Sequence, residues 1–132
     1  YKGDSQNIIY RSLWERKFMN YCDLNENILE WASEEFWIPY LDPTTNRVRR
    51  YFPDFFIKYK DKDSNIRRSV IEVKPMRETL EPKATKGKSR KTMINESMTY
   101  VKNQAKWKAA KEFCADRKLE FKIMTEKELG IR

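Results

Sequence analysis

The sequence predicts an α/β domain in which a mixed central β-sheet is flanked by helices, in the order α-β-β-β-α-β-α. Two long segments repeat apolar residues at helical spacing, and three segments between them alternate apolar and polar residues as strands do. A further alternating segment follows the second long helix, and a helix that connects two strands of one sheet implies a crossover. The 132 residues fit one domain, which we place at residues 1–132.

The first half of the chain is expected to form a helix, a loop and a meander of three strands. The helix is expected at residues 7–23 and the loop at residues 24–33. Strands are expected at 36–41, 48–59 and 66–74, because apolar residues alternate there between groups of turn-forming residues. The apolar stripe of the helix comprises Leu13, Trp14, Phe18, Tyr21 and Cys22.

The second half is expected to form a loop, a long helix, a strand and a short helix. Residues 76–90 lack periodicity and follow Pro75, so they are expected to form a mobile basic loop. The long helix is expected at 93–116 and the last strand at 119–123. Thr125, with a glutamate three residues later, is expected to open the last helix through a capping box. The long helix presents Ile94, Met98, Val101, Ala105, Ala109 and Phe113 on one face.

The residue types present restrict the chemistry of this chain. It contains no histidine, which excludes Ser-His-Asp and Cys-His catalysis, histidine-containing zinc fingers and histidine-liganded metal nucleases. A metal ion would have to be bound mainly through oxygen, which favours Mg²⁺ or Mn²⁺. Cys22 and Cys114 lie far apart in helical segments, and we expect both to be small buried side chains in a reducing compartment.

No segment indicates a membrane or a secretory pathway. No apolar run approaches the ~20 residues that span a bilayer, so no membrane partner is expected. No secretory signal pattern is visible either. The chain begins at Tyr1 and not at Met, so we expect further residues to precede it.

Positive charge is concentrated in one segment. The net charge is +8, and residues 82–111 contain nine Lys or Arg and one acid, Glu96, so that the rest of the chain is neutral. A neutral body with one basic segment is typical of a protein that binds a polyanion. The alternative is a solvated helix face beside a flexible loop.

The second and third expected strands determine which acidic side chains meet. If the loop at 61–65 closes a symmetric hairpin, Lys60 pairs with Ile66. Asp54 then lies opposite Glu72, with their side chains on the same face. A slip of one residue would separate the two carboxylates, so this prediction depends on the register.

Lys74 is expected on the same face as Glu72, opposite Phe52. Two carboxylates held opposite each other repel unless one is protonated, both are hydrated or a cation joins them. Mg²⁺ commonly takes one or two carboxylates, polarises a phosphate and lowers the pKa of a bound water. The Lys74 ammonium could then orient the attacking water and offset charge on a phosphodiester. The alternative is a salt bridge between Lys74 and an acid at the strand edge.

Glu15 is a third acidic candidate. It follows Ser12 by three residues, which is the spacing of a capping box at a helix start. The alternative is that Glu15 points from the first helix toward the sheet and helps to hold a metal ion.

Pro53-Asp54, followed after 17 residues by Glu72-Val73-Lys74, resembles the motif of the PD-(D/E)xK nuclease superfamily, and Glu15 supplies an upstream helical glutamate. That superfamily has a restriction-endonuclease-like α-β-β-β-α-β core, which agrees with the predicted order. A related pattern occurs in the N-terminal endonuclease domain of the transposase subunit that cuts the 5′ ends of heteromeric transposons, which normally carries a further C-terminal domain. Nearly the whole chain resembles the head completion nucleases of T-even-type phages, through RSLWERKFM, RYFPDFFIK, IEVKP, NQAKWKAAKEFC and FKIMTEKEL.

The resemblance implies a role for each residue of the motif. Glu15, Asp54 and Glu72 would form the acidic metal site for Mg²⁺ or Mn²⁺. The backbone carbonyl of Val73 would be a further ligand, and Lys74 would be the catalytic lysine.

The loop and long helix after the motif carry the expected DNA contacts. These contacts would be sequence-independent and salt-sensitive. Gln104 occupies a helix in which some superfamily members place a supporting glutamine, and an exposed polar position is the alternative. Trp107 and Tyr100 could stack on bases, although packing in the helix core is favoured. Pro82 stands where a phosphate-binding loop needs glycine, so no nucleotide cofactor is expected. The basic residues expected to contact DNA are Lys83, Lys86, Lys88, Arg90, Lys91, Lys102 and Lys106.

The resemblance implies a Mg²⁺-dependent DNA endonuclease that processes DNA in a packaged phage head so that neck and tail can attach. The expected partners are double-stranded DNA and phage portal or neck proteins. The expected locations are the host cytoplasm during assembly and the head or neck of the virion. Two alternatives remain: a structural head or neck protein that binds DNA with little catalysis, and a transposon-end endonuclease that needs a recombinase partner.

Overall fold

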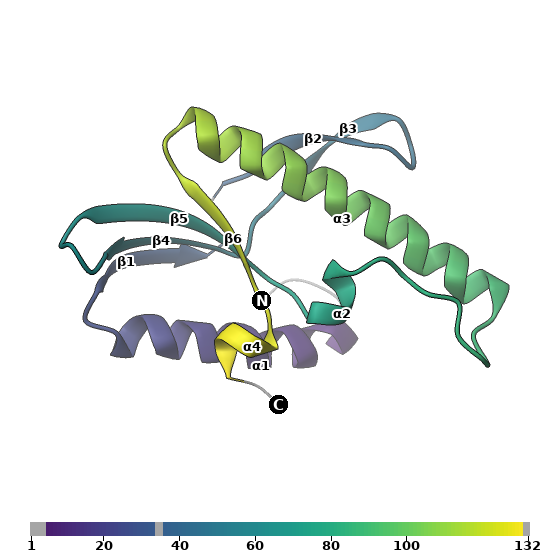
Figure 1. Ribbon diagram of the computed structural model, residues 1–132, viewed down its shortest axis with the longest axis horizontal. Helices are drawn as coiled ribbons and strands as arrows, with labels where there is room; N and C mark the ends of the chain where they lie inside the picture. Colours follow the sequence, from purple (N-terminus) through teal and green to yellow (C-terminus); the bar gives the residue numbers. More distant parts are fainter. Residues whose placement is uncertain (1–4, 34–35, 131–132) are drawn as a thin grey trace.

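The structure, a computed structural model, describes residues 5–33 and 36–130, and in this part of the chain it describes side chains from residue 13 onward. A central sheet has α1 and α4 on one face and α3 on the other, and a separate hairpin packs against α3 (Figure 1). The predicted class, a mixed sheet flanked by helices, is confirmed. The elements are α1 (Ser5–Leu24), β1 (Ile28–Ser33), β2 (Ile38–Asp42), β3 (Arg47–Tyr51), β4 (Phe55–Lys60), β5 (Ile66–Val73), α2 (Met76–Thr79), α3 (Arg90–Asp116), β6 (Glu120–Met124) and α4 (Glu126–Leu129).

The central sheet has four strands in the order β1-β4-β5-β6. The pairs β1–β4 and β4–β5 are antiparallel, whereas β5 and β6 are parallel because α3 returns the chain to the same end of the sheet. The strands β2 and β3 form the separate antiparallel hairpin. Among the described residues, no helix has the length and apolar character needed to cross a membrane.

The single strand expected at 48–59 is wrong, because this segment forms two strands in different sheets. β3 ends at Tyr51, β4 begins at Phe55, and the three residues between them leave the extended ladder. Pro53, which is buried in this break, has no N–H to donate to a neighbouring strand. The break therefore moves the chain from the hairpin into the central sheet and places Asp54 at the start of β4.

Two further elements lie where loops were expected. β1 occupies most of the segment 24–33, and its burial does not alternate cleanly, since Leu29 is exposed while Trp31 and Ala32 are both half-buried. This strand therefore lacks the period of two that predicts a half-buried strand. The short helix α2 lies within the segment 76–90.

The helix ends show one wrong and one confirmed expectation. α1 already begins at Ser5, so Ser12 lies inside the helix and the interpretation of Ser12 and Glu15 as a capping box is wrong. The capping box of α4 is confirmed: the Thr125 hydroxyl accepts a hydrogen bond from a first-turn N–H, and Glu128 accepts one from the Thr125 N–H at 2.7 Å. Gly130 ends α4 with a φ of 70°, a left-handed conformation that glycine adopts readily.

The two faces of the sheet bury different clusters. The α1 side contains the ring pair Phe18 and Phe55, whose centroids are 4.6 Å apart, together with Cys22. The α3 side is built around Trp107 and joins α3 to the hairpin and β6. Cys22 and Cys114 are buried free thiols, as expected.

Parts of both predicted helix stripes are wrong. Leu13 and Tyr21 of α1 are exposed. Ile94, Met98 and Val101 of α3 are also exposed, because the N-terminal half of α3 extends beyond the central sheet (Figure 1).

Candidate active site

The predicted hairpin register between β4 and β5 is confirmed, and it brings two acidic side chains together. Lys60 pairs with Ile66, and the ladder ends at the pair Phe55 and Ile71. Asp54 and Glu72 occupy the next position and are 3% and 5% exposed. The expected placement of Phe52 opposite Lys74 is wrong, because the chain leaves the ladder before Phe55.

Asp54 is held in place by the end of β5. Its Oδ2 accepts a hydrogen bond from the Val73 N–H at 2.8 Å. A backbone donor at this point fixes the carboxylate beside Glu72, the residue that precedes Val73 on β5. We refer to Asp54 and Glu72 as the acidic pair.

Two aromatic residues that were not predicted to belong to the site bind Glu72. The Tyr51 hydroxyl donates a hydrogen bond to Glu72 Oε2. The Trp107 indole Nε1–H donates to the same oxygen at 3.3 Å. Trp107 is thus a core residue, as favoured, but its polar edge faces the acidic pair. The only sequence signal for Tyr51 is its position three residues before Asp54.

The acidic pair has the electrostatics of two carboxylates that share a proton. Burial, followed by the charge and the hydrogen bond of Asp54, raises the pKa of Glu72 from 4.5 to about 8. The Lys74 charge and the Tyr51 hydroxyl oppose this rise. Burial and the Glu72 charge raise the pKa of Tyr51, so its hydroxyl remains a neutral donor. At neutral pH, without a cation, the pair therefore retains a proton.

Lys74 lies at the end of β5, directly beyond the acidic pair. Its backbone N–H donates to the Met124 carbonyl at 3.0 Å, which extends the β5–β6 ladder past Val73. Its side chain is half-buried, and its charge lowers the pKa of Glu72. The structure thus brings three predicted site residues, Asp54, Glu72 and Lys74, to one end of the sheet.

Lys106 is a second cation beside the acidic pair. It was expected to contact DNA from the surface of the long helix, but the structure places it half-buried over two tyrosine rings. Its Nζ lies 5.8 Å from the ring centroid of Tyr40 and 5.9 Å from that of Tyr51. Burial lowers the pKa of Lys106, the Lys74 charge lowers it further, and Glu72 opposes this.

Glu15 lies in a different layer from Glu72. α1 packs on the sheet face that carries Phe55, whereas Glu72 is directed to the α3 face through Tyr51 and Trp107. Glu15 is half-buried on α1, one turn before Phe18, and its side chain is not without a partner. Its role as a metal ligand stays a prediction.

The residues of the acidic pair fit a Mg²⁺ or Mn²⁺ ion. In the described part of the chain, no three acidic or cysteine side chains gather closely enough to hold a metal by themselves. Mg²⁺ nevertheless often uses only one or two carboxylates and keeps its waters. A buried carboxylate pair in which the pKa of Glu72 is raised is a place where a divalent cation can displace a proton. The Val73 carbonyl, at the end of β5, stays a predicted further ligand.

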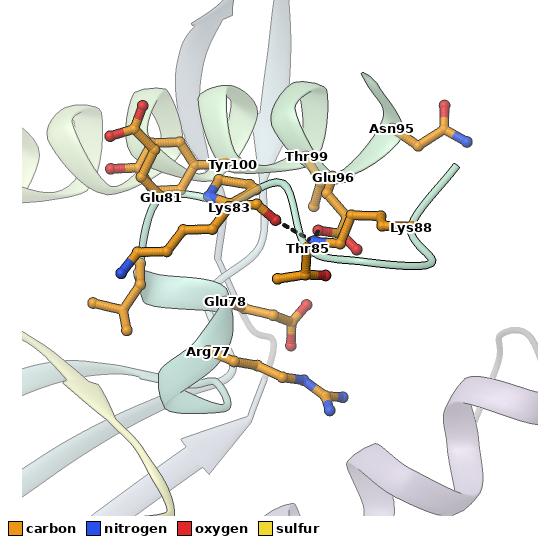
Figure 2. Close-up of a pocket in the computed structure, with 12 residues that line it drawn as sticks. Arg77, Glu78, Glu81, Lys83, Thr85, Lys88, Asn95, Glu96, Thr99 and Tyr100 are labelled. Atoms are coloured by element: carbon orange, nitrogen blue, oxygen red, sulfur yellow. Dashed lines mark hydrogen bonds and ion pairs between the residues drawn. The ribbon is translucent and has the colours of Figure 1, made fainter. Parts of the chain in front are cut away.

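Some of the predicted DNA-contact residues are exposed, and others already form ion pairs within the fold. Lys88 belongs to the second group, since its Nζ lies 2.9 Å from Glu96 Oε2 and donates to the Lys83 carbonyl at 2.7 Å (Figure 2). Lys102 Nζ lies 3.7 Å from the buried Asp42 carboxylate. Gln104 is exposed and forms no side-chain hydrogen bond with any described residue, so its supporting role stays a prediction. The exposed group consists of Lys83, Lys86, Arg90 and Lys91.

A groove of about 720 Å³ separates the segment after α2 from the first turns of α3 (Figure 2). Its lining carries both signs of charge, since it includes the cations Arg77 and Lys83 and the acids Glu78 and Glu96. Tyr100 is half-buried at this groove and not in the core. The groove does not include the acidic pair.

Comparisons with known proteins show the family to which this chain belongs. The family model described as TnsA-like endonuclease N terminal matches residues 25–126. The head completion nuclease of Enterobacteria phage T4 is 38% identical over 129 residues, which cover 96% of this chain and 83% of that protein. No solved structure gave a significant match. The match to the family model covers the acidic pair and Lys74, and the resemblance inferred from the sequence is confirmed. The chain belongs to the family of TnsA-like N-terminal endonuclease domains and is related to a phage nuclease, which gives it a nuclease role with DNA as substrate.

Proposed function

We propose that this chain is a metal-dependent DNA endonuclease whose active site is the acidic pair with Lys74. The observation that carries the proposal is the burial of Asp54 and Glu72 in hydrogen-bonded contact at the end of two paired strands. Such a pair is unfavourable unless a proton or a cation neutralises it. A purely structural sheet end would not require this arrangement.

Each residue of the site has a separate proposed role. Asp54 and Glu72 would hold Mg²⁺ or Mn²⁺, with the Val73 carbonyl and Glu15 as further candidate ligands. The bound ion would supply charge neutralisation at the phosphate and a lower pKa for a water molecule. The Val73 N–H fixes Asp54, and we infer that it keeps this carboxylate oriented during cleavage.

The surrounding cations and aromatic groups complete the proposed mechanism. The Lys74 ammonium would orient the attacking water and offset the negative charge that develops on the phosphodiester. Tyr51 and Trp107 hold Glu72 Oε2 from one side, which leaves the other oxygen as the candidate ligand. Lys106 would add positive charge next to the same phosphate.

The biological process that we propose is DNA processing during phage head completion. The support is the relationship to the T4 protein, whose name states this role, over nearly the whole chain. In this process the substrate would be double-stranded DNA, and portal or neck proteins would be partners. The chain would act in the host cytoplasm during assembly and remain in the head or neck of the virion.

Cleavage of supercoiled plasmid tests the proposed activity. Wild type should nick and then linearise the plasmid with Mg²⁺ or Mn²⁺ and should be inactive with EDTA. Asp54→Asn and Lys74→Met should each lose activity by about 100-fold or more, because each removes a group that acts in the transition state. Lys62→Met, which removes an exposed charge from the turn between β4 and β5, should keep the wild-type rate.

Three results would contradict the proposal or redirect it. Wild-type activity in Asp54→Asn would place the site elsewhere. An inactive wild type that still binds DNA would favour a structural head or neck protein. Activity that appears only with a recombinase partner would favour a transposon-end endonuclease, the function suggested by the name of the matching family.

A further inference from the structure

The β2–β3 hairpin is a separate two-stranded sheet whose inner and outer faces differ. Its inner face packs on α3, where Tyr40 and Tyr51 are buried around Trp107. Its outer face carries the cross-strand pair Leu41 and Val48, which are 56% and 72% exposed. Figure 1 shows the hairpin at the edge of the fold, with its turn away from the central sheet. In the described part of the chain, no element covers the outer face.

The hairpin carries two exposed cations that no described acid neutralises. Of the three arginines on β3, Arg49 is engaged, since its Nε lies 3.0 Å from Asp42 Oδ2. Arg47, opposite Asp42, and Arg50, opposite Pro39, lie on opposite faces of the ribbon, because side chains alternate along a strand. Both are exposed, and within the described residues neither forms an ion pair. The guanidinium of Arg50 lies 4.7 Å from the ring centroid of Trp37, a cation–π contact that holds the arginine in place while leaving it accessible.

Asp42 anchors the hairpin to α3. Burial of Asp42 opposes its ionisation, but hydrogen bonds from Thr44 and the Lys102 charge outweigh burial and lower the pKa of this carboxyl to about 2. Asp42 therefore stays ionised and attracts Arg49 and Lys102 from two different elements. Because Lys102 lies on α3, its contact with Asp42 joins the hairpin to that helix.

The hairpin is also connected to the acidic pair. β3 ends at Tyr51, whose hydroxyl donates to Glu72, and Asp54 follows three residues later. A strand rises ~3.3 Å per residue, so Arg47 at the tip lies about 13 Å along β3 from Tyr51. Successive phosphates along one strand of B-DNA advance by ~3.4 Å, so this distance corresponds to about 4 base pairs.

We propose that the β2–β3 hairpin is a DNA-contact arm, in which Arg47 and Arg50 bind phosphates of the duplex a few base pairs from the bond at the acidic pair. This inference rests on the proposed function, because it takes duplex DNA as the substrate. Charge complementarity identifies the occupant, since the accessible charges of the hairpin are positive and DNA is a polyanion. A two-stranded ribbon also has dimensions that a DNA groove admits. Contacts with phosphates position the duplex without reading its sequence.

Salt-dependent DNA binding tests the arm without requiring cleavage. Binding of a labelled 30-base-pair duplex is measured by fluorescence anisotropy in EDTA between 50 and 200 mM NaCl. Arg47→Ala/Arg50→Ala should bind more weakly and show a log–log salt slope smaller by about 2, because each phosphate contact adds ~0.9 to the slope. Over this range wild type should therefore lose about tenfold more affinity than the variant.

The β4–β5 hairpin provides a matched control. Lys62 and Arg68 are exposed on that hairpin, which closes at Lys60 and Ile66, the end of β4–β5 away from the acidic pair (Figure 1). Lys62→Ala/Arg68→Ala removes the same charge and should keep the wild-type slope. Arg47→Lys/Arg50→Lys keeps the charge and should also keep the slope, and circular dichroism melting checks that each variant folds.

Four outcomes would contradict the proposed DNA-contact arm. A wild-type slope in Arg47→Ala/Arg50→Ala would refute it and leave the nuclease proposal intact, as would equal losses in the two alanine variants. Unchanged DNA binding with an altered sedimentation coefficient would identify the outer face as a protein interface. If wild type binds no duplex at all, both the proposed function and the arm fail.

Discussion

The metal-free protein should become less stable as pH rises from 5.5 to 7.5. The pKa of Glu72 is raised from 4.5 to about 8, so in this window the native state keeps a proton that the unfolded chain releases. The free energy of unfolding must then fall with pH, by up to about 1.4 kcal/mol per pH unit for one proton. Over the two units the loss should be about 2 kcal/mol, with stability highest at the acidic end.

This chain is well suited to the measurement because little else titrates between these pH values. It has no histidine, and burial raises the pKa of Cys22 and Cys114 to about 11, so both thiols stay protonated. Urea denaturation in EDTA at pH 5.5, 6.5 and 7.5 gives the slope directly. Glu72→Gln replaces the carboxyl by a neutral group of similar shape and should make the free energy of unfolding nearly independent of pH.

Two results would refute this reasoning. A wild-type free energy of unfolding that stays constant or rises with pH would mean that Glu72 is ionised at pH 5.5 without a cation. An equal slope in wild type and Glu72→Gln would assign the proton to another group. In either case the acidic pair would not share a proton in the metal-free protein.

Four further substitutions test other parts of the structure. Phe18→Ala should lower the free energy of unfolding by about 3–5 kcal/mol, because it opens a cavity between α1 and β4. A loss below about 1 kcal/mol in urea denaturation would contradict the packing of α1 on the sheet. Asp42→Asn should reduce the free energy of unfolding at pH 7. The lowered pKa of Asp42 stabilises the fold above pH 3.8, and this contribution disappears as pH falls toward about 2, so the variant should lose less stability than wild type between pH 4 and pH 2. An equal loss in wild type and variant would contradict the role of Asp42 in holding the hairpin. Lys106→Met should slow plasmid cleavage by about tenfold or more while leaving the salt slope of DNA binding within about one unit of wild type, whereas an equal loss of binding would make Lys106 only a DNA contact. Tyr51→Phe removes a hydrogen bond that lowers the pKa of Glu72, so the pH profile of cleavage should shift upward, and an unmoved profile would separate Tyr51 from the site.

The part of the site that follows from local chain geometry could be predicted from the sequence. The hairpin loop between β4 and β5 is short, so the pairing of Lys60 with Ile66 determines which residues of the two strands lie opposite each other. The placement of Asp54 beside Glu72 therefore follows from the sequence alone. Lys74 followed from alternation along the same strand.

The part that depends on tertiary packing could not be predicted in this way. The separation of β3 from β4 depends on the break around Pro53, which alternation alone does not reveal. Tyr51 and Trp107 reach Glu72 only because the hairpin folds over α3. The exposure of Ile94 on α3 likewise reflects how far the sheet extends beneath the helix, which helical periodicity does not encode.

The positive charge of the β2–β3 hairpin is not visible when charge is averaged over long segments of the sequence. Outside residues 82–111 the chain is neutral overall, which hid the local concentration of arginines on β3. The structure distinguishes Arg49, which is neutralised by Asp42, from Arg47 and Arg50, which are not. Charge balance therefore has to be assessed on the folded surface.

The central claim, that Asp54 and Glu72 form a divalent cation site, is tested most directly by Mn²⁺ binding followed through loss of the free Mn²⁺ signal in electron paramagnetic resonance. Wild type should bind Mn²⁺ at the acidic pair, and Asp54→Asn and Glu72→Gln should each weaken binding by about tenfold or more, because each removes a charged ligand. Asp63→Asn, which removes an exposed carboxylate from the turn between β4 and β5, should bind as wild type does. Equal Mn²⁺ binding by wild type and Asp54→Asn would contradict the claim.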